Sequence, residues 1–356
     1  LNGSLPNLQN FRNPFLSHGR QRLVADSDGG LYCRHMFKRF HLNQEPYMNM
    51  KRSILLPLLL AFSGAALAQP AELSTPIRGI TLESTDNLDM TLKLIKSSRK
   101  RLTVRLVMDD DDISAYKKVV DALAPHANVM VQILDSEQMP NYSVEKIRRR
   151  TTRAMNAFGD KVALWEIGNE LNGNWVGSSP QEINAKAQAA YEVVKKRNGK
   201  TALTLNYWSS PNCYEKDWEA TSKYAESLPA SLRNVDYAFL SIYETVCTPA
   251  QHPSSNDLAR TFNHFKGQFS KATKFGIGEI GTQDESDEQK PATLEEKKRI
   301  ANYYYGLQQP LYAKMGDRYV GGYFWWYFHR DATLPEVNGG RKDNLWPTLK
   351  GLLEQL

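Results

Sequence analysis

The stretch Trp165-Glu166-Ile167-Gly168-Asn169-Glu170 closes an apolar, strand-like run with a glutamate. A second stretch, Phe275-Gly276-Ile277-Gly278-Glu279-Ile280-Gly281, has the same character and follows after about 110 residues. Runs rich in β-branched and aromatic residues predict buried strands. The two stretches therefore predict strands that each end in a carboxyl group.

Short apolar runs of this kind alternate with amphipathic segments along most of the chain. Eight are predicted as strands: Ile77–Leu82, Leu102–Met108, Asn128–Leu134, Val162–Asn169, Ala202–Trp208, Tyr237–Tyr243, Phe275–Glu279 and Tyr319–Trp326. Apolar residues at helical spacing predict helices at Leu88–Lys100, Ser114–Leu123, Val144–Phe158, Pro180–Arg197, Asp257–Phe269, Leu294–Lys314 and Trp346–Leu356. Eight strands that alternate regularly with helices favour a closed parallel barrel over a doubly wound sheet. The predicted fold class is α/β, a single (β/α)8 TIM barrel.

The two glutamates are expected at one end of this barrel, because functional groups gather at the C-terminal ends of the strands. Glu170 follows the fourth predicted strand and Glu279 closes the seventh. Two carboxyl groups at one mouth suit the cleavage of a glycosidic bond. One protonates the leaving oxygen, and the other meets the oxocarbenium-like transition state from the opposite side.

The N-terminal region has the pattern of a secretory signal. Met50-Lys51-Arg52 is basic, the run Ile54–Phe62 is apolar, and Ala66-Leu67-Ala68 is a small-x-small cleavage site. The run is shorter than the roughly 20 residues that a membrane helix needs. We expect residues 48–68 to be removed and the product to be periplasmic or secreted, without stable membrane insertion. An uncleaved anchor is the alternative.

Residues 1–47 are polar and basic without sustained periodicity, and we interpret them as a disordered, non-native upstream extension. The chain carries a formal charge of +6 from 45 Lys+Arg and 39 Asp+Glu. Because residues 1–68 hold 8 of the basic and 3 of the acidic residues, 37 and 36 remain in residues 69–356. Nearly balanced charge gives no reason to expect nucleic acid as a partner. These 288 residues suit one catalytic (β/α)8 domain, which we expect to be a monomer.

Two of the three cysteines, Cys213 and Cys247, follow the predicted cleavage site. In an exported protein they can form a disulfide, worth about 3–4 kcal/mol in the chain-entropy model. Two separate buried thiols are the alternative. No histidine or cysteine cluster has zinc spacing, and the sequence has no phosphate-binding glycine loop or nucleophile-elbow serine. We therefore expect neither metal nor cofactor.

The strand-end residues resemble those of the retaining glycoside hydrolases of clan A. These (β/α)8 barrels carry an acid/base glutamate after an asparagine at the end of strand four, and a nucleophile at the end of strand seven. The resemblance implies that Asn169 binds substrate, that Glu170 is the acid/base and that Glu279 is the nucleophile. Retention also implies carboxyl groups about 5–5.5 Å apart. The family within the clan stays open.

Further strand ends match the clan. Arg105 corresponds to the barrel arginine that holds the nucleophile ionised, and Tyr243 to a tyrosine that contacts the nucleophile. Trp326 corresponds to the aromatic floor beneath the sugar, and Trp175 and Trp208, with Tyr207, could extend that platform.

Several nearby residues have a structural interpretation instead. We expect Glu166 to pair with an arginine or lysine, and Trp325 to pack against a helix. The aspartates from Asp109 to Asp112 are interpreted as solvated, although a metal or cationic-sugar site is the alternative. His329 near the mouth is as compatible with packing as with catalysis.

The sequence thus predicts a retaining endo-β-glycosidase that acts outside the cytoplasm on a polysaccharide or oligosaccharide by double displacement. An exo-acting enzyme is one alternative, since the pattern Gly168–Gly173 is similar to that of α-L-arabinofuranosidases, and a transglycosylase is another. A non-catalytic carbohydrate-binding barrel is the third. An open groove lined by Trp175 and Trp208 would favour endo action.

Overall fold

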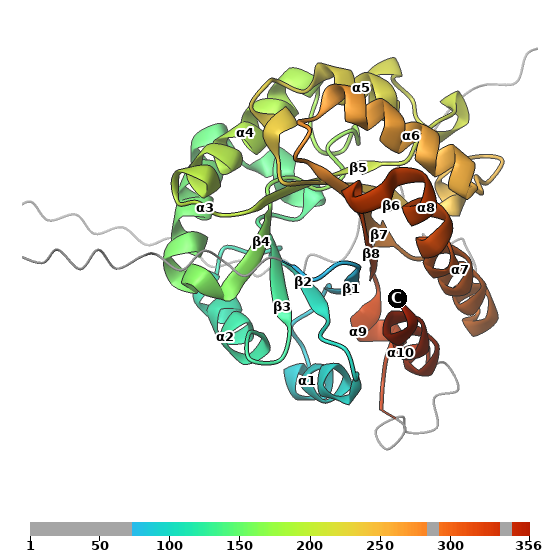
Figure 1. Cartoon of the computed structure of the whole chain (residues 1–356). Coiled ribbons are helices and arrows are strands. Elements are labelled where there is room, and N and C mark those ends of the chain that lie inside the picture. The colour runs from blue at the N-terminus through green and yellow to red at the C-terminus, as the bar shows by residue number, and fades with distance from the viewer. Residues whose placement is uncertain (1–72, 283–291, 335–343) are drawn as a thin grey trace, which may run out of the picture. The chain divides into compact units, whose positions relative to one another are not determined.

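The computed structural model describes residues 73–282, 292–334 and 344–356 (Figure 1). Within these ranges, eight parallel strands close into a barrel in which every strand pairs with its neighbour in sequence and β8 pairs with β1. The predicted (β/α)8 fold is confirmed. The predicted signal and the upstream extension lie outside the described residues, so both stay predictions.

The strands agree closely with the predicted runs. Their bounds are β1 Ile77–Leu82, β2 Thr103–Val107, β3 Asn128–Gln132, β4 Val162–Glu166, β5 Thr201–Asn206, β6 Tyr237–Ile242, β7 Lys274–Ile280 and β8 Tyr319–Trp325. Strand β4 ends three residues earlier than expected, at an irregularity described below.

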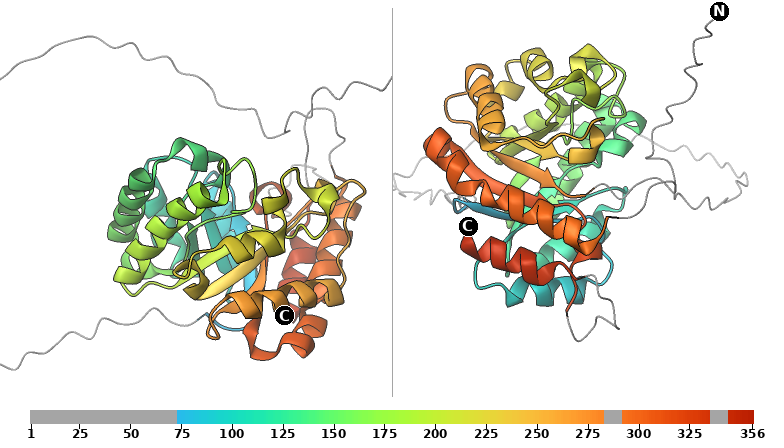
Figure 2. Two further views of the ribbon diagram at one scale, coloured as in Figure 1. Left: turned by 90° about the horizontal axis from the view of Figure 1, so that it is seen from above. Right: turned by 90° about the vertical axis from the view of Figure 1, so that its right-hand side faces the viewer.

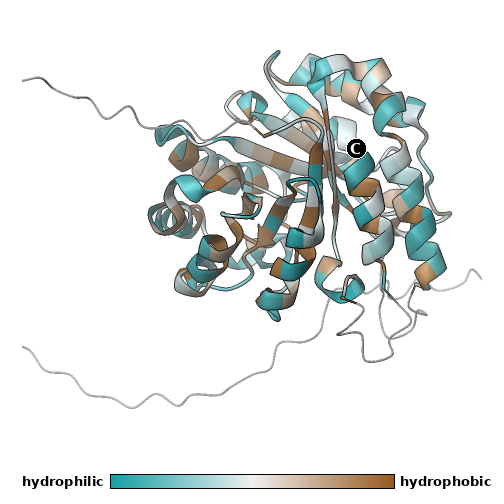
Figure 3. Ribbon diagram, turned by 60° about the horizontal axis from the view of Figure 1, so that its bottom comes forward, coloured by the Kyte–Doolittle hydropathy of each residue, from teal (hydrophilic) through white to brown (hydrophobic). Residues whose placement is uncertain are grey.

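Helices surround the barrel, as the views in Figure 2 show. The longer ones are α1 Leu88–Ser97, α2 Ile113–Leu123, α3 Val144–Phe158, α4 Pro180–Lys196, α6 Ser255–Gln268, α7 Leu294–Gly306, α8 Gln308–Met315 and α10 Trp346–Gln355. Their hydrophilic residues alternate with hydrophobic ones that face the barrel (Figure 3). The short helices α5 Thr221–Ser227 and α9 Phe328–Asp331 were not predicted, because they span too few turns to show a period.

The predicted helix Leu294–Lys314 is two helices, α7 and α8, which meet at Leu307. Pro310 lies in the first turn of α8. A proline has no N–H and its ring clashes with the carbonyl four residues earlier, here that of Gly306, so it interrupts a continuous helix.

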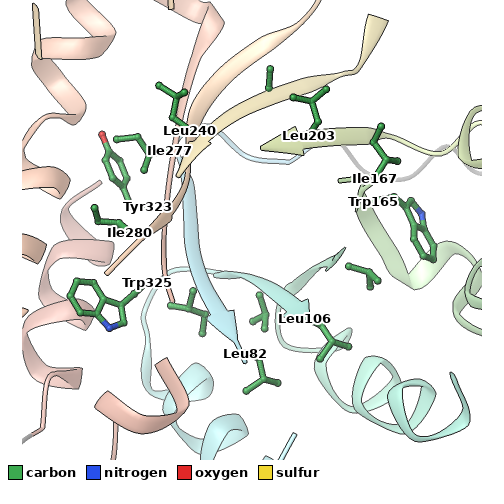
Figure 4. Packing of buried hydrophobic residues seen from close by; sticks show 14 of the residues in the cluster. Leu82, Leu106, Trp165, Ile167, Leu203, Leu240, Ile277, Ile280, Tyr323 and Trp325 are labelled. Atoms are coloured by element: carbon green, nitrogen blue, oxygen red, sulfur yellow. The ribbon is translucent and has the colours of Figure 1, made fainter. Parts of the chain in front are cut away.

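Strand side chains alternate between the helix-facing core and the barrel interior. Leu203, Leu240 and Ile277 are among those that point outward to the helices (Figure 4). The interior contains an apolar cluster that includes Ile77, Met130, Leu164, Ala202, Tyr237, Phe239, Val320 and Phe324. Toward the C-terminal strand ends the interior becomes polar, so the barrel supports buried charges on an apolar base.

The segment that follows β4 continues to pair with β5, and its pairing is irregular where it passes Glu170. The amide of Thr204 donates to the carbonyl of Gly168 (3.0 Å), and the next ladder bond runs from the amide of Leu171 to the carbonyl of Thr204 (3.2 Å). A regular parallel ladder would use residue 170 for this second bond, so the segment after β4 carries one extra residue. Glu170 takes up the irregularity with φ 50°, in the left-handed region.

Strand β7 has a second bulge beside Glu279. Leu240 of β6 pairs with Ile277, whereas the next residue, Ser241, pairs with Glu279, which leaves Gly278 as the extra residue. A Cβ at Gly278 would lie 2.6 Å from the Cβ of Phe239, so only glycine fits there. Bulges turn side chains in new directions. Both glutamates therefore depend on an irregular strand.

Candidate active site

One buried guanidinium joins three strands inside the barrel. Arg105 of β2 donates from Nε to Glu166 of β4 (2.7 Å) and from Nη1 to Glu279 of β7 (2.6 Å). Arg105 and Glu166 are fully buried, and Thr204 of β5 adds a hydrogen bond to Glu166 (2.5 Å). The predicted structural pairing of Glu166 with an arginine is thus confirmed.

Three donors converge on Glu279. Besides Arg105, the hydroxyl of Tyr243 donates to Oε1 (2.7 Å), and Nδ2 of Asn169 lies 3.5 Å from Oε2. Hydrogen bonds and a cation of this kind stabilise the ionised form of a carboxyl group. Burial, with the negative charge of Glu279, raises the pKa of Tyr243 well above its usual value, so the phenol keeps the proton that it donates.

Glu170 has a different environment. Its Oε1 accepts a hydrogen bond from Ser241 of β6 (2.6 Å). Burial, and then the negative charge of Glu279, raises the pKa of Glu170 well above its usual value. The two carboxyl groups interact through space, but their partners differ: Glu279 is bound by a guanidinium and a phenol, whereas Glu170 is bound by a serine hydroxyl. Such a pair can divide acid and nucleophile roles.

The side chain of Asn169 leaves one polar atom unpaired. Its Oδ1 is buried and has no hydrogen-bond partner among the described residues. It is therefore an acceptor available to a bound hydroxyl group. The substrate-binding role predicted for Asn169 stays a prediction.

The two tryptophans at the end of β8 have different surroundings. Trp326 is partly exposed, and the guanidinium carbon of Arg105 lies 5.3 Å from its ring centroid. Trp325 is fully buried among helix-facing residues, and its Nε1 donates to Asp331 of α9 (2.9 Å). The structure thus places Trp326 beside Arg105 and Trp325 in the helix-facing packing.

Aromatic residues and a disulfide follow β4, β5 and β6. The rings of Trp175 and Trp208 meet edge to face at 5.7 Å, and Trp175 donates to Ser136 after β3 (3.3 Å). Trp208 packs on the disulfide Cys213–Cys247, which confirms the predicted pairing. Only 5% of Trp208 is exposed, so Trp175 supplies most of the accessible ring surface of this pair.

Tyr207 belongs to the helix-facing core and is 4% exposed. It therefore lies away from the platform that Trp175 could form. Its neighbour Trp208 packs instead on the disulfide Cys213–Cys247.

The acidic run after β2 is structural in part. Asp112 caps helix α2 through the amide of Ser114 (2.9 Å), and Asp111 accepts from Arg150 (3.0 Å). Within the described ranges, no group of three or more His, Cys, Asp or Glu side chains is placed to hold a metal ion. No helix of the described chain is long and apolar enough to cross a membrane.

The sequence interpretation missed two residues of the site. Ser241 contacts Glu170, and its position two residues before Tyr243 would have placed it on the same strand face. Asp135 follows β3, and burial raises its pKa to about 7, with the charge of Glu279 contributing. Its backbone position, just beyond a predicted strand end, was the available indication.

Fold and strand-end carboxyl groups together define a (β/α)8 barrel of the type found in glycoside hydrolases. Among solved structures, a broad-specificity endoglucanase of glycoside hydrolase subfamily 5-4 from an uncultured bacterium is similar, with 14% identity, 81% of this chain and 97% of that chain covered, and a TM-score of 0.54. The family 5 glycoside hydrolase PbGH5A of Prevotella bryantii B14 is also similar, with 14% identity, coverage of 79% and 95%, and a TM-score of 0.52.

The β-glycosidase BGL167 is a third similar structure, with 12% identity, coverage of 76% and 86%, and a TM-score of 0.51. No family model and no curated protein matches the chain. At such identities these likenesses show the shared barrel fold.

Proposed function

We propose that this protein is a retaining glycosidase in which Glu279 is the nucleophile and Glu170 the acid/base. The observation that carries the proposal is the contrast between the two carboxyl groups. Glu279 receives hydrogen bonds from Arg105 and Tyr243, whereas burial and the charge of Glu279 raise the pKa of Glu170. A nucleophile must be ionised and a general acid must hold its proton.

In the first step, an oxygen of Glu279 attacks the anomeric carbon while Glu170 gives its proton to the departing glycosidic oxygen. A covalent glycosyl-enzyme forms and the leaving group departs as an alcohol. In the second step, Glu170 takes a proton from water, which displaces Glu279 from the sugar. The product keeps the starting anomeric configuration.

We propose an endo-acting enzyme for a β-linked polysaccharide outside the cytoplasm. Trp175 and Trp326 offer partly exposed rings near the strand ends, and aromatic faces suit the apolar faces of sugars. The disulfide Cys213–Cys247 supports an oxidising compartment. A closed pocket in place of a groove would favour the exo-acting alternative. The size of the released products distinguishes endo from exo action.

The test uses purified residues 69–356 and a set of polysaccharides and aryl β-glycosides. The anomer formed first is identified by proton NMR, and retention is expected. Glu279→Gln should abolish turnover of every substrate. Glu170→Gln should spare dinitrophenyl glycosides, whose leaving group needs little protonation, and azide should accelerate their turnover by releasing the glycosyl-enzyme. Inversion, or equal loss on activated and unactivated substrates without an azide effect, would contradict the assigned roles.

A further inference from the structure

The carboxyl group of Glu170 is held by a neutral hydroxyl group. Ser241 lies in β6, is 2% exposed, and places Oγ 2.6 Å from Oε1 of Glu170. Within the described residues, the structure gives the other carboxyl oxygen of Glu170 no hydrogen-bond partner. Ser241 also pairs in register with Glu279, at the bulge of β7. One serine is thus anchored beside one glutamate and bonded to the other.

We propose that Ser241 is a positioning residue that keeps the proton of Glu170 on the oxygen facing the substrate. This inference rests on the proposed function. The serine hydroxyl donates to Oε1. A carboxyl oxygen that accepts such a bond is the carbonyl oxygen of the protonated acid, so the proton resides on Oε2. When Glu170 gives up that proton, Oε1 keeps its donor.

The hydroxyl group suits a residue that changes charge twice in each cycle. A cation would hold the carboxylate strongly and lower its pKa, which would weaken the preference for the protonated form. A carboxylate bound by a cation occurs nearby at Glu166, which accepts hydrogen bonds from both Arg105 and Thr204. Glu166 has a cation and a hydroxyl as partners, whereas Glu170 has the hydroxyl of Ser241.

The hydrogen bond to Oε1 also fixes the direction in which the carboxyl group of Glu170 presents its proton. A carboxyl group that rotates freely presents its proton to the leaving oxygen only part of the time. Ser241 fixes the carboxyl plane from a buried strand, and the backbone on either side of Glu170 is held by the hydrogen bonds of Gly168 and Leu171 with Thr204. Both half-reactions benefit, because the same oxygen donates the proton in the first and accepts it in the second.

The experiment compares Ser241→Ala with Ser241→Thr, which keeps the hydroxyl. The rate constant kcat/KM is measured against pH for an aryl glycoside with a poor leaving group. We expect about tenfold loss for Ser241→Ala, the factor that corresponds to one hydrogen bond. The basic limb of the profile should move to higher pH, because the bond from Ser241 lowers the pKa of Glu170. Ser241→Thr should restore both kcat/KM and the pH position of the basic limb.

Thr204→Val is the matched control. It also removes a buried hydroxyl bonded to a glutamate, but that glutamate is Glu166. We expect the basic limb to stay in place in this variant. If Ser241→Ala is unstable, Ser241→Cys provides the same test, because a thiol is a weak donor of similar size. A basic limb that does not move in Ser241→Ala or Ser241→Cys, or that moves equally in Thr204→Val, would overturn the inference.

A second measurement separates this inference from the proposed function. The carboxyl carbon of Glu170 is titrated by 13C NMR in the wild type and in Ser241→Ala, with Glu170→Gln for assignment. A higher titration midpoint without Ser241 is expected even if no glycoside is hydrolysed, and an unchanged midpoint refutes the contact. Failure of the wild type on every glycoside would refute the proposed function alone.

Discussion

Replacing Arg105 by methionine tests the charge network that organises the barrel interior. The change leaves Glu166, which is fully buried, and Glu279, which is 3% exposed, without their common cation. Removal of one partner of a buried ion pair costs about 3–5 kcal/mol. For a domain of this size, with an m-value of about 3–4 kcal/mol per M, the urea midpoint should fall by about 1 M.

The loss should depend on pH in a defined direction. Burial already raises the pKa of Glu166, and Arg105 opposes that shift. Without Arg105 the native pKa rises further above the unfolded value. Stability from such a group is complete below its unfolded pKa and is lost as the pH rises through its native pKa. The deficit of Arg105→Met should therefore be smaller at pH 5 than at pH 8.

A double-mutant cycle isolates the pair. Adding Glu166→Leu to Arg105→Met should recover about 2–3 kcal/mol, because a buried unpaired carboxylate is replaced by an apolar group. Arg148→Met is the control, since it removes a partly exposed pair with Glu192 (2.9 Å) and should cost less than about 1 kcal/mol. Additive costs, or a loss below about 1 kcal/mol for Arg105→Met, would refute the reasoning.

Three further predictions concern other parts of the structure. Replacing both Cys213 and Cys247 by serine should lower the free energy of unfolding by about 3–4 kcal/mol, because the bridge joins residues 34 apart; an unchanged urea midpoint would contradict this. Glu170→Gln should raise the melting temperature at pH 8 but not at pH 4, since the raised native pKa of Glu170 makes its ionised form destabilising; calorimetry at both values decides. Gly278→Ala should reduce kcat and stability through its close contact with Phe239, whereas Gly267→Ala, in α6 with open space around it, should stabilise by about 0.4–1 kcal/mol and leave kcat unchanged. Equal behaviour of the two alanine variants would argue against the bulge as the cause.

The sequence predicted the barrel because its strands are short, apolar and evenly spaced. Strands such as β1 and β6 lie within a residue of their predicted ends, since burial on both faces leaves a continuous apolar run. Strand β4 ends three residues before its predicted end, because the irregular pairing that follows it depends on β5, which no local pattern encodes. Pro310 is the sequence signal for the break between α7 and α8, because a proline interrupts a continuous helix.

The site was predictable where strand ends carry unusual side chains. The structure brings Asn169, Glu170, Arg105, Tyr243 and Glu279 together as the strand order implies. Ser241 was missed because a serine within a strand is ordinary in composition, and its contact depends on β6 and β4 meeting across the barrel. The burial of Trp208 also could not be predicted from the sequence, since it depends on contacts with the disulfide and with Trp175.

The irregular pairing beside Glu170 and Glu279 ties both glutamates to the hydrogen bonds of the barrel wall. Glu170 and Glu279 take their directions from ladder bonds between neighbouring strands, whereas Trp175 and the disulfide lie in the connecting segments. The proposed catalytic residues and the residues of the proposed sugar platform therefore lie in separable portions of the chain. For the proposed glycosidase, loops from another barrel grafted after β4 or β5 should change which sugar polymer binds. Deleting one residue at either irregularity should abolish activity and leave the surface intact.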